Sequence, residues 1–168
     1  MQNVYCGVGK LAWDTCLFHL ILAILGYIFL LFAALSGAAY FVVDRFERGF
    51  DFGGPAVSES LAFWKSMRFR LNCYYLLLGF AAFTAALVTG AAKADLYWKS
   101  GWMRDPKIVF SLIMWVYYFI VILIIPVFMK LKETRKRRFL ISALSTAGLA
   151  FLGSNLALGY FSKLHHYL

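Results

Sequence analysis

The chain has 168 residues, of which 62% are hydrophobic, and its mean hydropathy is +0.73. Because soluble domains have roughly 45–50% apolar residues, this composition predicts an integral membrane protein. The net charge of +9 does not indicate nucleic-acid binding, since the cations fall in short connections between apolar runs and cannot form the basic face of a soluble domain.

Four apolar runs are each long enough to cross a bilayer, which takes about 20 residues. The first run carries His19 near its start, and its glycines and alanines permit close contacts between helices. Together the runs predict one membrane domain over residues 1–168. The predicted spans are about residues 15–43, 71–92, 108–129 and 139–161.

The first two spans are joined by a basic connection, residues 44–70. Its segment 51–55, Asp-Phe-Gly-Gly-Pro, is typical of a helix break. The residues after the break, 58–67, are typical of a short amphipathic helix lying at the membrane surface.

The second connection, residues 93–105, is a loop that contains two tryptophans. Asp105 at its end is the expected N-cap of the next helix, and Pro106 is the expected first helical residue. The third connection, residues 130–138, has six cations and one anion.

The distribution of charge predicts the topology, because Lys and Arg collect in cytoplasmic loops. Residues 130–138 and 44–70 are therefore expected in the cytoplasm and residues 93–105 on the outer side. The predicted fold class is an all-α integral membrane protein of four antiparallel transmembrane helices, with both termini on the outer, periplasmic face. We expect it in the inner, cytoplasmic membrane of a bacterium or an organelle.

The histidines of the chain are His19, His165 and His166. The predicted topology puts all three near the outer face, His19 about one turn inside the first span and His165 just beyond the last. Two imidazoles that approach one axis from opposite sides are what bis-histidine ligation of haem requires.

Other side chains at the same depth are suited to the rest of a haem. Trp98 and Trp102 would form a flat apolar wall, and Arg104 or Lys107 would pair with the propionates. The same residues have a plainer interpretation, because tryptophans anchor membrane proteins at the interface and a histidine near a helix end can reach the surface. The residues alone leave both interpretations open, although an ionisable group within a span, here His19, is a functional candidate by default.

The tryptophan loop and the helix after it resemble the tryptophan-rich "WWD" signature of cytochrome c biogenesis proteins. That family handles haem at the outer membrane face and includes the system II cytochrome c synthase. The resemblance covers most of the chain in order and corresponds to the C-terminal half of larger members. The similar segments are residues 98–107, 112–117, 79–80, 87–91, 18–20, 26–27, 37–40 and 164–167.

The resemblance implies that His19 and His165 correspond to the paired outer-face histidines of the family, which ligate haem beside the tryptophan loop. Trp98 and Trp102 fall on signature tryptophans, and Asp105 falls on the signature aspartate, where it would fix the loop. The catalytic residues of the family's reaction are not identified by this comparison.

The sequence departs from the family pattern at three positions. Arg104 stands where the signature has a tryptophan, Ile108 where it has an acid, and Leu123 aligns with the membrane-embedded histidine of the family. The extra spans of a full synthase are also missing from this chain. We therefore expect a minimal or diverged member that is not a complete synthase by itself.

The expected function is haem handling at the outer membrane face in cytochrome c assembly, with a non-covalent b-type haem. The expected partners are membrane lipid, other membrane or periplasmic subunits and apocytochrome c, with no nucleic acid. An alternative is a structural or b-haem-carrying membrane subunit of a larger respiratory electron-transfer complex. A further alternative is an interfacial scaffold without a cofactor.

Overall fold

The computed structural model describes residues 10–49, 55–98, 102–130 and 134–158, with side chains described chiefly over 17–46, 59–94, 103–127 and 138–158. Over these residues the fold is all-helical, as predicted, and four helices are long and apolar enough to cross a membrane. The elements are α1 (Lys10–Gly49), α2 (Pro55–Trp98), the 3₁₀ turn η1 (Trp102–Arg104), α3 (Pro106–Met129) and α4 (Thr134–Leu158).

Helix α2 is continuous across the stretch that was expected to be a separate surface helix. Residues 58–67 are helical, but they belong to the same helix as the second span, so the expectation of a separate interfacial helix is wrong. Between Pro55 and Gly79 the sequence has neither proline nor glycine to interrupt the helix. The side chains of Lys65 and Phe69 are buried, so the packed face of α2 extends beyond the predicted span.

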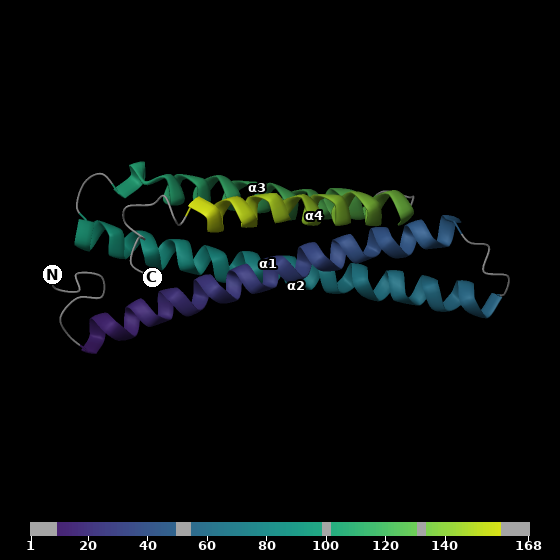
Figure 1. Cartoon of the computed structure of the whole chain (residues 1–168), viewed down its shortest axis with the longest axis horizontal. Helices are drawn as coiled ribbons and strands as arrows, with labels where there is room; N and C mark the ends of the chain where they lie inside the picture. Colours follow the sequence, from purple (N-terminus) through teal and green to yellow (C-terminus); the bar gives the residue numbers. More distant parts are fainter. Residues whose placement is uncertain (1–9, 50–54, 99–101, 131–133, 159–168) are drawn as a thin grey trace.

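Helices α1 and α2 form the longest packed pair, while α3 and α4 lie along one side of it (Figure 1). Near the start of α1, His19 contacts Gly90. Further on, Leu30 lies against Gly79, and near its end Asp44 pairs with Lys65. Residue numbers therefore rise along α1 as they fall along α2.

The bundle has two ends that differ in chemistry. The first turns of α1 and α3 and the last turns of α2 and α4 make up one end, which we call the His19 end (Figure 1). The opposite end contains the last turns of α1 and α3 and the first turns of α2 and α4, and we call it the Asp44 end.

Glycines allow the helices to approach closely. A Cβ atom at Gly79 would lie 2.8 Å from the backbone nitrogen of Leu30, and one at Gly37 would lie 2.7 Å from the carbonyl oxygen of Ser142. Both distances are shorter than real Cβ contacts. Small residues at such positions are typical of helix packing in membranes.

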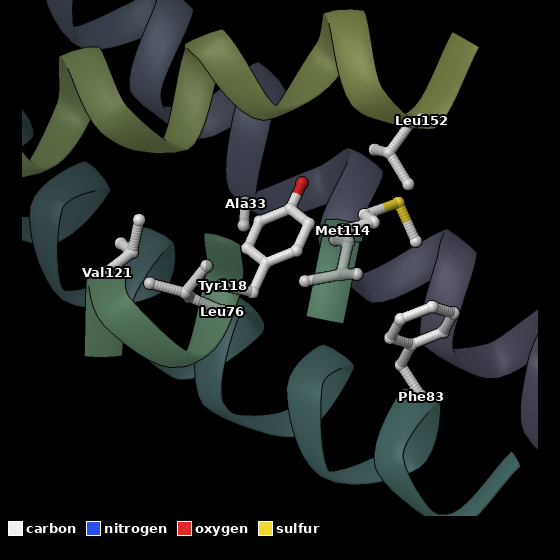
Figure 2. Close-up of a cluster of buried hydrophobic side chains, with 8 residues drawn as sticks. Ala33, Leu76, Phe83, Met114, Tyr118, Val121 and Leu152 are labelled. Carbon is white, nitrogen blue, oxygen red and sulfur yellow. The ribbon is translucent and has the colours of Figure 1, made fainter. Parts of the chain in front are cut away.

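The core lies where all four helices meet (Figure 2). Many other large apolar side chains point outward, including Leu123, which is 56% exposed, and Val88, which is 65% exposed. An apolar exterior is expected of a bundle whose solvent is lipid. The buried cluster consists of Leu30, Ala33, Leu76, Phe83, Met114, Tyr118, Val121 and Leu152.

Buried hydrogen bonds join the helices to one another. Asn155 of α4 accepts a hydrogen bond from Tyr27 of α1 and donates one to Ser111 of α3 at 2.8 Å. Ser145 of α4 donates to Asn72 of α2, also at 2.8 Å. Such bonds between membrane helices contribute about 0.6 kcal/mol each on average, and here they fix the position of α4 against the other three.

Candidate functional site

His19 is held against α2 by a hydrogen bond to the backbone. Its Nδ1 atom lies 2.9 Å from the carbonyl oxygen of Ala86 and 3.2 Å from the hydroxyl of Thr89. Because a carbonyl can only accept, the Nδ1–H must be the donor. In the neutral imidazole, Nε2 then keeps its lone pair and is the atom that can bind a further group.

Gly90 provides the space for this imidazole. A Cβ atom at position 90 would lie 2.7 Å from Cε1 of His19, so a larger residue would displace the ring. Ala86, Thr89 and Gly90 have the spacing of one helix face. This face of α2 thus places a carbonyl acceptor, a hydroxyl group and the free space beside Gly90 at the same level as His19.

Two cations lie close enough to His19 to interact with its charge, namely Lys93 of α2 and Lys107 of α3. Lys107 is half-buried, whereas Arg104, also expected at the site, is exposed. The His19 end therefore combines an imidazole with positive charge from two further helices. Such a combination favours a ligand that bears negative groups.

Asp105 caps helix α3, as predicted. Its side-chain Oδ1 accepts a hydrogen bond from the backbone nitrogen of Lys107 at 2.9 Å, and its carbonyl oxygen accepts from Val109 at 3.1 Å. Pro106 is the first residue of the helix. The cap fixes where α3 starts and hence where Lys107 lies relative to His19.

The tryptophan segment is more helical than a loop. Residues 93–98 continue α2, so Trp98 is the last residue of that helix, and Trp102 is the first residue of η1. The side chains of both tryptophans lie outside the described residues, as do His165 and His166. The predicted pairing of His19 with His165 beside a tryptophan wall therefore stays a prediction.

A shallow apolar hollow of about 570 Å³ lies beside His19 on α1 and α2. The hydroxyl of Thr84 is turned inward, because it donates to Phe80 O at 2.7 Å and accepts from Trp115 Nε1 at 2.9 Å. The surface of the hollow is consequently almost wholly apolar. It is lined by Phe18, Leu22, Phe80, Ala81, Thr84, Ala85, Val88 and Thr89.

Sequence reasoning identified His19, Asp105 and Lys107 but missed the α2 residues that surround the imidazole. Thr89 and Gly90 lie in the segment 87–91 that resembles the family, and Lys93 lies in the predicted loop 93–105, but neither pattern assigns these residues a place beside His19. Their signal is the register between α1 and α2, which becomes visible only once the two helices are paired.

The fold is that of a multi-pass helical membrane protein in which the imidazole of His19 is held by a hydrogen bond at one end of the bundle. The family model described as cytochrome c assembly protein matches residues 11–161, which is nearly the whole chain. The chain therefore belongs to the cytochrome c assembly protein family, as its resemblance to cytochrome c biogenesis proteins predicted. No curated protein and no solved structure matches it.

Proposed function

We propose that this protein holds a non-covalent b-type haem at the outer face of the membrane during cytochrome c assembly. The observation that carries the proposal is the hydrogen bond from His19 Nδ1 to the Ala86 carbonyl. A histidine that ligates a metal through one ring nitrogen almost always donates the other N–H to such an acceptor. The role in cytochrome c biogenesis is inferred from membership of the cytochrome c assembly protein family.

In this proposal His19 and His165 are the axial ligands of the haem iron, and Trp98 and Trp102 wall the ring. The apolar hollow beside His19 provides surface that suits a porphyrin edge. When bound, the haem would supply redox-active iron whose potential depends on its axial ligands. The chain itself orients the imidazole and keeps its Nδ1 proton in place.

The propionates are assigned to cations at the same end. Lys107 and Lys93 support this assignment because both lie near His19. Arg104 is exposed next to the Asp105 cap, where a propionate at the surface would reach it. Asp105 has a positioning role, since it fixes the first turn of α3.

We further propose that the helices cross the inner membrane antiparallel to one another, with both termini on the outer, periplasmic side. The reversed order of the contacts between α1 and α2 supports the antiparallel part. The cations of residues 44–70 and 130–138 support a cytoplasmic Asp44 end. The partners would be apocytochrome c and other membrane or periplasmic subunits.

The test is to purify the full chain in mild detergent and to record its reduced-minus-oxidised spectrum with a pyridine haemochrome assay. We expect the bands of a b-type haem, lost in His19→Ala and in His165→Ala and kept in the control His166→Ala. Unchanged haem in both ligand variants would end the ligand assignment. A chain that stays colourless after haem is added would contradict haem handling altogether.

Copurification separates the proposal from its main alternative, a structural or b-haem-carrying subunit of a respiratory complex. Haem handling predicts recovery with apocytochrome c. Recovery with electron-transfer subunits and without apocytochrome c would support the alternative.

A further inference from the structure

Two arginines at the Asp44 end each have a buried guanidinium nitrogen without a hydrogen-bond partner in the described part of the chain. The Nε atoms of Arg68 and Arg138 are both shielded from solvent and lack a hydrogen-bond partner. The guanidinium carbon of Arg138 lies over the ring of Phe69, 6.0 Å from the ring centroid, and Arg68 has no hydrogen bond or ion pair with the described residues. Both side chains are half-buried.

The nearby acids whose side chains are described are either paired with another group or exposed. Asp44 is buried and pairs with Lys65 at 3.0 Å, while Glu59 is exposed. Two other arginines of this end, Arg45 and Arg70, are exposed and can be satisfied by water. Arg68 and Arg138 differ from them in being partly desolvated and, among the described residues, without a counter-charge.

A guanidinium stays charged at any physiological pH and matches phosphate geometry with its planar fork of N–H donors. Partial burial without a counter-ion is unfavourable, so an oxyanion that reached the terminal N–H groups of either guanidinium would be stabilising. Both arginines belong to candidate membrane spans, Glu59–Ala94 and Arg138–Leu158. Anionic phosphate at that position is available from lipid headgroups.

We propose that Arg68 and Arg138 bind the phosphate groups of anionic phospholipids at the Asp44 end. Arg68 and Phe69 are successive residues of α2, so their side chains point about 100° apart. Because Arg138 lies over Phe69, the two arginines contact headgroups on different flanks of α2. Large exposed side chains beside them, Met67 at 42% and Phe139 at 45%, face the acyl chains.

The experiment counts bound lipids by native mass spectrometry on the full chain in mild detergent. Phosphatidylglycerol is compared with phosphatidylcholine of the same acyl chains. The wild type should retain phosphatidylglycerol preferentially, and Arg68→Gln and Arg138→Gln should each weaken its binding about tenfold. The matched controls Arg45→Gln and Arg70→Gln should bind like the wild type.

Three results would overturn the proposal. No preference for phosphatidylglycerol would exclude an anionic-lipid site. An equal loss in all four variants would show that binding depends on diffuse surface charge. Displacement of the lipid by millimolar inorganic phosphate would identify free phosphate as the ligand instead.

Thermal unfolding tests whether the variants act through the lipid or through the fold. Arg68→Gln removes no hydrogen bond or ion pair to the described residues, so its midpoint in lipid-free detergent should equal that of the wild type. Added phosphatidylglycerol should then raise the wild-type midpoint more than that of the variant. A lower midpoint for the variant without lipid would mean that Arg68 has a structural role, which contradicts the proposal.

Discussion

At the scale of single residues, the site depends on how the His19 imidazole is oriented. One backbone carbonyl, Ala86 O, accepts from Nδ1, and one glycine, Gly90, leaves room for the ring. Neither residue would be singled out by its type, since both are common in membrane helices. Their importance comes from lying opposite His19.

Replacing Gly90 by alanine should displace the imidazole, because the added Cβ would lie 2.7 Å from Cε1. We expect about 1–3 kcal/mol of overpacking strain and a lower haem content in Gly90→Ala than in the wild type. The control is Gly153→Ala on α4, where an added Cβ meets nothing within 4 Å. Equal haem content in both variants would contradict the close packing of His19 on α2.

At the scale of one helix, Asp105 determines where α3 begins. Asp105→Ala removes the hydrogen bond to Lys107 N and should lower the free energy of unfolding by about 1 kcal/mol. Asp105→Asn keeps a side-chain acceptor and should restore most of that stability. Thermal unfolding in detergent measures both variants, and an Asn variant as unstable as the Ala variant would rule out a capping role.

The pairing of α1 with α2 includes the buried ion pair Asp44–Lys65, at 3.0 Å. Lys65→Met removes the ammonium group that pairs with the buried Asp44 carboxylate and should cost about 3–5 kcal/mol. The double variant Asp44→Leu, Lys65→Met removes both charges and should recover most of the loss. Thermal midpoints of the single and double variants check this, and equal destabilisation of the two would show that the ion pair is not the source of the cost.

At the scale of the whole molecule, the apolar runs were sufficient to predict a bundle of four membrane-spanning helices. The Asp105–Pro106 helix start was also predictable, because both residues have strong local preferences. The continuity of α2 was not predictable, because Lys65 and the arginines around it are typical of a polar connection between two spans. Only tertiary pairing with α1, and with Asp44 in particular, shows that this polar stretch is part of the packed helix.

The candidate site, too, was predictable only in part from the sequence. Its histidine and cap residue were identifiable from position and residue type. The groups that set the His19 tautomer and the cations near it come from α2 and α3, and their approach depends on helix register. Local patterns contain no information on that register.

The proposed orientation of the bundle predicts which ends are accessible from outside the cell. In a variant without native cysteines, Arg104→Cys should react with a membrane-impermeant thiol reagent in intact spheroplasts. Arg70→Cys, also at an exposed position but at the Asp44 end, should react only after the membrane is opened. The reverse pattern would invert the topology and move His19 to the cytoplasmic side.

The most direct test of the central claim, that His19 Nε2 ligates haem iron, is rescue of His19→Gly by free imidazole. The variant leaves a gap beside Gly90 in which imidazole can take the place of the side chain. We expect the b-type spectrum, which is lost in His19→Gly, to return as imidazole is titrated in. A variant that keeps the wild-type spectrum without imidazole would contradict ligation by His19.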